Sequence, residues 1–310
     1  MTGSGVDRGR EAAGVFVISI TPFDAEGRLD ETGLRAHLRR MAEAGIGVYV
    51  GGGGSGEGYT LDPGEAHRVV EVAVEEIGHL VPVRAMGVEP RTSAEMVTYI
   101  NAAAGAGVGA AQVYSLDPGH GHRPTDAEIR RYFLDVLDGI GIPAVLSSHQ
   151  SVGYRLAPKL LSDLIQRFDV IGVNCSQPDL GYLADVVDVV EGRAQVHVGG
   201  PHQALAALAL GGHGYLSSEA NLAPRLAAAV VERHAAGDLA GCLDAYGRVL
   251  RLSSGLYGRG GIRATKSVLN RLGLPGGVPR PPQLPVEGAE LDECMDLVRA
   301  LDLGRFEGWS

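Results

Sequence analysis

The chain has few cysteines and no long apolar run. Its three cysteines, Cys175, Cys242 and Cys294, are odd in number and widely spaced, which argues against a disulfide framework and a cysteine-based zinc cluster. No apolar run reaches the roughly 18 residues of a membrane helix, and residues 1–13 lack the apolar core of a signal peptide. We therefore expect free thiols, no membrane partner and a cytoplasmic location.

Positive charge is also scarce. The chain has 27 Lys and Arg residues against 37 Asp and Glu residues, a net charge of −10, and no run of basic residues. This balance argues against nucleic acid as a partner. Lysine is especially rare, because Lys159 and Lys266 are the only two in the sequence.

Short β-rich segments alternate with amphipathic helical segments eight times. A doubly wound sheet of this length would usually show fewer and less regular units, so the pattern predicts an α/β protein with a (β/α)8 TIM barrel. The expected strands are 15–20, 47–50, 81–86, 110–114, 144–148, 170–174, 195–198 and 215–218. The expected helices are 30–44, 63–77, 92–104, 126–137, 157–168, 180–191, 202–210 and 224–236.

The pattern changes after about residue 237 to helices alone, expected at 239–252, 263–272 and 291–301. No linker or low-complexity tract splits the preceding repeats. We expect a flexible N-terminus at 1–13, a barrel at 14–236 and a C-terminal helical extension at 237–310.

A glycine-rich turn follows the second expected strand. Four consecutive glycines lead into Ser55, so backbone N–H groups can converge on an anion and the hydroxyl can add a donor. The turn predicts a site for a small carboxylate or phosphate at Gly53, Gly54, Ser55 and Gly56. The alternative is a flexible tight turn without a ligand.

Several ordered motifs resemble the dihydrodipicolinate synthase/N-acetylneuraminate lyase family over nearly the whole chain. The resemblance implies a TIM barrel, assembly as a homodimer or homotetramer, and action on 2-oxo acids such as pyruvate through a Schiff base to a lysine that ends strand six. The motifs are Ile20-Thr21-Pro22-Phe23 with Gly27 and Asp30, Gly53-x-x-Gly56-Glu57 with Leu61 and Glu65, and Gly212-x-Gly214 with Ser217, Asn221 and Pro224.

The chain departs from that family at the residues that carry its chemistry. Asn174 stands at the position of the imine-forming lysine, Ser147 at that of a tyrosine, and Gly54 at that of a threonine. An amide cannot form an imine. Lys159 falls in the helix after strand five and Lys266 in the C-terminal extension, so neither is expected at the barrel mouth. The resemblance also implies that Glu57 braces the loop rather than takes part in catalysis.

Other ionisable groups follow the strands instead. His149 ends strand five and is our candidate general acid or base, because an imidazole exchanges protons near pH 7; the alternative is a loop histidine with a local hydrogen bond. Asn174 would donate a hydrogen bond to a developing oxyanion, assisted by Ser147 or Ser148. Cys175 is a possible nucleophile or a small apolar filler.

Further residues are expected to line the substrate pocket. The loop after strand four carries Tyr114, Asp117 and His120, and Ser217 lies at the end of strand eight. His120 and His122 form a pair without a third ligand in their segment, so we expect no metal and no other cofactor. Weaker candidates for the pocket wall are Tyr154, His197, Glu219 and Asn221.

Together these features predict a lyase-type enzyme that works without a lysine Schiff base on a small, 2-oxo acid-like carboxylate. Its reaction would be an elimination, a hydration, a retro-aldol cleavage or a cyclisation. The alternative is a non-catalytic ligand-binding protein of the same fold. The high content of Gly, Ala and Arg suggests a bacterial source and a role in specialised metabolism.

Overall fold

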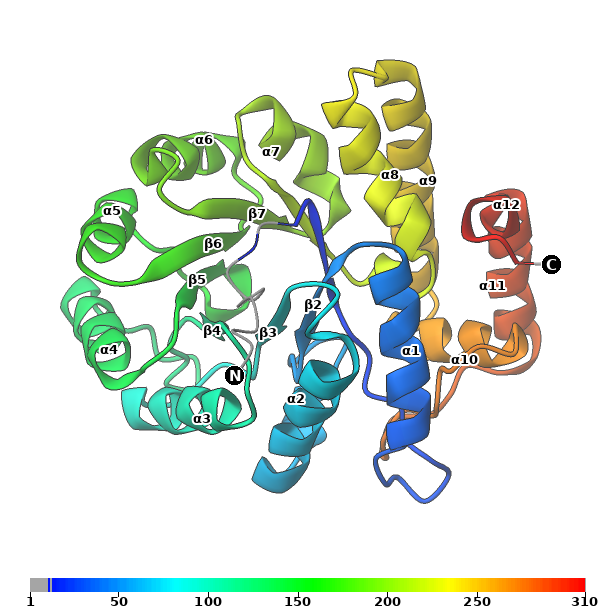
Figure 1. Cartoon of the computed structure of the whole chain (residues 1–310), viewed down its shortest axis with the longest axis horizontal. Helices are drawn as coiled ribbons and strands as arrows, with labels where there is room; N and C mark the ends of the chain where they lie inside the picture. The colour runs from blue at the N-terminus through cyan, green and yellow to red at the C-terminus, as the bar shows by residue number, and fades with distance from the viewer. Residues whose placement is uncertain (1–10, 12, 310) are drawn as a thin grey trace, which may run out of the picture.

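The protein forms a closed barrel of eight parallel strands in chain order, surrounded by helices (Figure 1). The computed structural model describes residue 11 and residues 13–309. The expected TIM barrel is therefore confirmed. The strands are β1 (Val15–Ile18), β2 (Gly47–Val50), β3 (Val83–Ala85), β4 (Ala111–Val113), β5 (Ala144–His149), β6 (Val170–Ser176), β7 (Gln195–Gly199) and β8 (Gly214–Ser217).

A helix follows each strand, as the sequence pattern predicts, and most ends differ from the predicted ones by one or two residues. The barrel helices are α1 (Glu31–Glu43), α2 (Pro63–Ile77), α3 (Ser93–Gly105), α4 (Asp126–Gly139), α5 (Pro158–Arg167), α6 (Leu180–Val190), α7 (Ala204–Ala209) and α8 (Pro224–Ala235). The extension holds α9 (Leu239–Tyr257), α10 (Ile262–Arg271), α11 (Gly288–Ala300) and α12 (Leu303–Glu307). The short helix α12 was not predicted.

Local sequence signals fix several of these helix starts. Asp62 accepts from the backbone N–H of Glu65, and the Glu65 carboxylate accepts in return from the N–H of Asp62, which forms a capping box with Pro63 at the first helical position. Thr125 and Glu128 form the same reciprocal pair at the start of α4. Such caps satisfy backbone N–H groups that a helix start leaves without partners.

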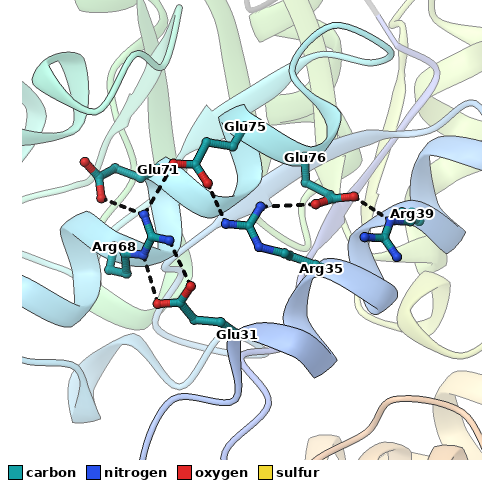
Figure 2. Close-up of polar contacts among 7 residues, drawn as sticks. All are labelled: Glu31, Arg35, Arg39, Arg68, Glu71, Glu75 and Glu76. Carbon is teal, nitrogen blue, oxygen red and sulfur yellow. Dashed lines mark hydrogen bonds and ion pairs between the residues drawn. The ribbon is translucent and has the colours of Figure 1, made fainter.

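Helices α1 and α2 are joined by a row of ion pairs on the outer surface. Figure 2 shows the side chains alternating in charge between the two helices. Arg35 contacts both Glu75 and Glu76, and Arg68 contacts Glu31 at 2.9 Å. Each exposed ion pair of this kind contributes little to the free energy of unfolding, although a network of several pairs can hold two helices in a defined arrangement.

The C-terminal extension packs against the first and last units of the barrel. Figure 1 shows α9 beside α8, with α10 to α12 following on the same side. Arg280 attaches the segment after α10 by a hydrogen bond from Nη1 to the Glu65 carboxylate at 2.7 Å and by stacking 4.1 Å from the Phe23 ring. Glu307 accepts from the N–H of Leu226 at 2.9 Å, so α12 caps the start of α8.

The three cysteines are buried free thiols. None of the helices in residues 13–309 combines the length and the apolar character that crossing a membrane requires.

Candidate functional site

A cavity of about 790 Å³ opens where the carboxyl ends of the strands meet. Each strand, or the loop that follows it, contributes to its wall, which is where (β/α)8 barrels place their chemistry. The C-terminal extension supplies one further side of the wall. Those residues are Ser253, Ser254, Leu256, Tyr257, Gly260, Gly261, Ile262 and Thr265.

Asn174 lines the cavity from near the end of β6 and is only 2% exposed. Its Nδ2 donates to Oε1 of Gln112 at 2.6 Å and to the hydroxyl of Tyr49 at 3.3 Å. Its Oδ1 is buried and has no hydrogen-bond partner. Both amide hydrogens are thus engaged, so the geometry does not fit the expected donor to an oxyanion. The free atom of Asn174 is an acceptor.

A buried polar chain holds Asn174 from below. Arg84, which is fully buried, donates to the Tyr49 hydroxyl at 3.3 Å and to Oε1 of Gln195 at 3.0 Å. Its guanidinium also lies 4.3 Å from the centre of the Phe16 ring. Hydrogen-bonded chains in a barrel core restrict the side chains that belong to them. The amide of Asn174 is therefore held in one orientation.

His149, at the end of β5, also lines the cavity and belongs to a second polar chain. Its Nδ1 lies 2.5 Å from the Ser151 hydroxyl and 3.1 Å from the Ser151 backbone N–H. The Ser151 hydroxyl donates to Glu89 at 2.8 Å, and the Tyr59 hydroxyl donates to the other oxygen of Glu89 at 2.7 Å. The imidazole is thus linked through one hydroxyl to a carboxylate.

The surroundings of His149 keep the imidazole neutral. Burial lowers the pKa of His149 below its usual value of 6.5, and the negative charge of Glu89 opposes that shift. A neutral imidazole near pH 7 can act as a general base or, in its other tautomer, as a hydrogen-bond donor. The Ser151 backbone N–H, which donates to Nδ1, favours the tautomer with hydrogen on Nε2, whereas the Ser151 hydroxyl can serve either tautomer.

The glycine-rich turn supplies only part of the predicted anion site. Gly54 and Ser55 line the cavity, and the Ser55 hydroxyl donates to that of Ser218 at 2.8 Å. The Gly53 N–H, in contrast, already donates to the carbonyl of Gly87 at 3.0 Å. Gly56 packs beneath the turn, where a side chain would meet the Gly52 backbone. Gly53 and Gly56 shape the turn and do not line the cavity.

Strand geometry separates the other predicted residues, because successive side chains point to opposite faces. Ser147 lines the cavity, whereas the Ser148 hydroxyl lies behind the strand, 2.8 Å from that of Tyr182. Ser217 likewise turns away and donates to Glu219 at 2.9 Å, while its neighbour Ser218 lines the cavity. Ser148 and Ser217 therefore do not line the cavity.

Of the predicted residues after β4, the structure places Tyr114 in the cavity wall. Asp117 lies outside it and pairs with Arg91 at 2.6 Å. His120 is exposed, at a left-handed turn with a φ of +52°. Thus Asp117 and His120 do not line the cavity. No group of three metal-binding side chains occurs within residue 11 and residues 13–309.

Glu57 has the bracing role that the resemblance implies. Its carboxylate accepts from Nζ of Lys266 and, at 2.9 Å, from the backbone N–H of Arg280. Lys266 donates as well to the carbonyls of Thr21 at 2.8 Å and Val278 at 3.0 Å, so its three hydrogens are all used. The other lysine, Lys159, is exposed near the start of α5. Neither lysine lines the cavity.

The sequence reasoning missed several cavity residues. Glu89 lies in the loop after β3, and this position at the carboxyl end of a barrel strand is the sequence signal that identifies it as a candidate. Nothing in the sequence spacing of Ser151 and Tyr59 links them to Glu89. Gln112 lies within β4 and gives no sequence signal of its contact with Asn174.

Fold and cavity together define a (β/α)8 barrel protein with a polar site at the carboxyl mouth, held in place by a helical extension. Residues 11–301 match the model of the Dihydrodipicolinate synthetase family. The chain therefore belongs to this family.

Named relatives and solved structures agree with that assignment. The chain is 31% identical over 287 residues to a 4-hydroxy-tetrahydrodipicolinate synthase of Methylobacterium radiotolerans, covering 90% of this chain and 92% of the relative. It is 29% identical over 280 residues to the enzyme of the same name from Methanopyrus kandleri, covering 88% and 91%.

Two solved structures of differently named proteins share the fold. One is YagE, a prophage protein of the dihydrodipicolinic acid synthase family from Escherichia coli K12 in complex with pyruvate, with a TM-score of 0.85 and 24% identity over 94% of this chain and 99% of that one. The other is the N-acetylneuraminate lyase of Proteus mirabilis, with a TM-score of 0.83 and 20% identity over the same shares. The shared fold alone does not select a reaction.

Proposed function

We propose that the protein is a lyase-type enzyme that acts on a small carboxylate-bearing substrate without forming an imine to a lysine of its own. The observation that carries the proposal is the cavity itself, in which Asn174 and His149 share one wall while Lys159 and Lys266 lie elsewhere. An amide is not a nucleophile toward a carbonyl. The side chains that line the cavity can supply proton transfer and hydrogen bonding to a reaction at this site.

In this mechanism His149 moves the proton. To remove a proton from substrate at Nε2, the imidazole must carry its hydrogen on Nδ1 and donate it to the Ser151 hydroxyl, which donates to Glu89; this arrangement replaces the hydrogen bond that Nδ1 accepts from the Ser151 backbone N–H. The imidazolium formed in this way can return the proton from Nε2 to a leaving oxygen, whereas the neutral ring with hydrogen on Nε2, whose Nδ1 accepts from the Ser151 backbone N–H, can donate only a hydrogen bond. This exchange suits an elimination, a hydration, a retro-aldol cleavage or a cyclisation.

The substrate carboxylate would lie against the glycine-rich turn. The N–H groups of Gly54 and Ser55 have no acceptor in the part of the chain that the structure describes, and both residues line the cavity. The hydroxyls of Ser55 and Ser218 lie beside them. Backbone N–H groups and hydroxyls are the donors that a small anion needs.

Reductive trapping tests the absence of an enzyme imine. After incubation with pyruvate and borohydride, we expect intact-protein mass spectrometry to show no added mass. The Asn174→Lys variant is the matched positive control, since it places an amine in the cavity wall and should be trapped. A pyruvyl adduct on Lys159 or Lys266 of the parent would contradict the proposal.

Turnover separates the enzyme from a non-catalytic binding protein of the same fold. We expect the parent protein to turn over at least one member of a panel of small 2-oxo, 2-amino and 2-hydroxy acids. NMR would detect the reaction as the loss of a carbon–carbon or carbon–oxygen bond in the substrate. Tight ligand binding with no turnover across such a panel would favour the binding protein. The expected homodimer or homotetramer is a separate prediction that sedimentation would measure.

A further inference from the structure

The charged groups of the cavity are unbalanced in sign. Two carboxyl groups line it, those of Glu89 and Glu219, and no arginine or lysine does among the described residues. Its two histidines are His149 and His202, and burial keeps the first of them neutral. A cleft lined by one sign of charge concentrates ligands of the opposite sign.

A simple carboxylate anion would therefore enter a negative cavity with no cationic side chain to balance it. The donors of the glycine-rich turn can hold such a group, but they carry no net charge. A ligand that carries a positive charge of its own avoids the repulsion between its carboxylate and the carboxylates of Glu89 and Glu219. A zwitterion, with a carboxylate at one end and a protonated nitrogen at the other, is neutral overall.

Asn174 provides an acceptor for that nitrogen. Its Oδ1 is buried without a partner, and its Nδ2 is held by Gln112 and Tyr49. A buried acceptor that stays unsatisfied costs free energy. A ligand N–H that reaches Oδ1 removes this cost, whereas a ligand carbonyl oxygen would place two acceptors against each other.

We propose that the substrate carries a nitrogen hydrogen-bond donor, an amine or iminium, on the carbon that lies against Asn174 Oδ1. The inference rests on the proposed function, because it places the carboxylate of the same molecule at Gly54 and Ser55. The substrate class is then a 2-amino or 2-imino acid. The nitrogen belongs to the substrate and not to the protein.

The test compares three acids of one carbon skeleton, which differ only at carbon 2. Norvaline presents an ammonium group, 2-hydroxyvalerate a hydroxyl and 2-oxovalerate an acceptor oxygen. Dissociation constants from ligand-observed NMR should rank norvaline tightest, at least about tenfold below 2-oxovalerate, since a hydrogen bond to a charged group contributes about 1.5–3 kcal/mol. 2-Hydroxyvalerate should fall between them.

Two variants and a control assign the preference to one atom. Asn174→Leu should reduce the preference for norvaline over 2-oxovalerate to the part that the carboxylates of Glu89 and Glu219 provide, and Asn174→Asp should strengthen norvaline binding, because a carboxylate attracts ammonium more than an amide does. Lys159→Ala, which changes an exposed side chain of α5, should leave the ranking unchanged. Circular dichroism verifies that each variant folds.

The outcomes separate the two proposals. If 2-oxovalerate binds as tightly as norvaline or tighter, the nitrogen donor is refuted while a carboxylate site stands. If butylamine, which lacks the carboxylate, binds as tightly as norvaline, the carboxylate site at Gly54 and Ser55 is refuted and the nitrogen site stands. A preference for norvaline that is undiminished in Asn174→Leu would also overturn the assignment to Asn174.

Discussion

Lys266 and Glu57 form an ion pair that solvent does not reach, with side-chain exposures of 0% and 1%. The lysine belongs to α10 in the C-terminal extension, and the glutamate follows the glycine-rich turn after β2. The pair thus fastens the extension to the loop that shapes the cavity. Burial lowers the pKa of Lys266, and the Glu57 carboxylate opposes that shift.

Removing one partner of this pair should destabilise the protein strongly. We expect Lys266→Met to lower the free energy of unfolding by about 3–5 kcal/mol, because it leaves the Glu57 carboxylate buried without its cation. The double variant Lys266→Met with Glu57→Gln should recover part of that loss. Urea unfolding measures both, with Lys159→Met as the control. A single variant as stable as the parent would contradict this account.

Two glycines near the cavity should respond differently to a side chain. A Cβ at Gly54 would meet nothing within 4 Å, whereas one at Gly58 would lie 2.4 Å from the Gly51 carbonyl oxygen. We expect Gly54→Ala to change the free energy of unfolding by less than about 0.5 kcal/mol. Gly58→Ala should cost about 1–3 kcal/mol through overpacking. Thermal unfolding of the two variants under one condition provides the comparison.

Two buried histidines make stability fall in acid. Burial is the main cause that lowers the pKa of His37 and of His197 to about 3, from the usual 6.5. Below pH 6.5 the unfolded chain binds these protons and the folded protein does not. The free energy of unfolding should therefore drop by about 1.4 kcal/mol per pH unit for each histidine as the pH falls from 6.5 toward 3.

The variant His37→Gln should remove one of these two contributions. Glutamine can still donate to Oδ1 of Asn221, which His37 Nε2 contacts at 3.0 Å. Urea titrations between pH 7 and pH 5 should show a shallower loss of stability in the variant. His67→Gln, at a half-exposed site on α2, serves as the control. An unchanged slope in His37→Gln would show that its titration does not contribute.

Variants of His149 and Glu89 should have different kinetic effects, the first on kcat and the second on the pH dependence of the rate. His149→Ala should lower kcat by about two to four orders of magnitude if it transfers the proton. Glu89→Gln removes the negative charge that raises the pKa of His149, so the acid limb of the pH–rate profile should move to lower pH. Glu290→Gln, on the exposed face of α11, is the control. Activity of His149→Ala within a few-fold of the parent would remove this residue from the mechanism.

The sequence predicted the eight strands and their helices because each unit carries its own apolar periodicity and cap. It predicted Asn174, His149 and Ser147 in the cavity for the same reason, since each ends or nearly ends a strand. Ser148 shows the limit of that reasoning. A shift of one residue along a strand reverses the face on which a side chain lies, and the sequence did not fix that alternation.

Contacts between distant units were beyond prediction. Tyr49, Gln112 and Asn174 come from three strands, and only the curvature of the closed barrel brings their polar atoms together. The same holds for the hydroxyl of Ser151, which meets Glu89 from two strands away. The use of the Asn174 amide hydrogens could not be known without these neighbours, so its role was predicted as donor when the free atom is the acceptor.

The wall that the extension gives to the cavity can vary independently of the strands. All eight strands precede Tyr257 and Thr265 in the chain, so the residues that close one side of the cavity lie in a separate part of the sequence from His149 and Asn174. Substitutions in residues 253–265 can therefore change which ligands enter the cavity without changing the strands that carry His149 and Asn174. The extension is the natural place to diversify this protein in a directed-evolution library.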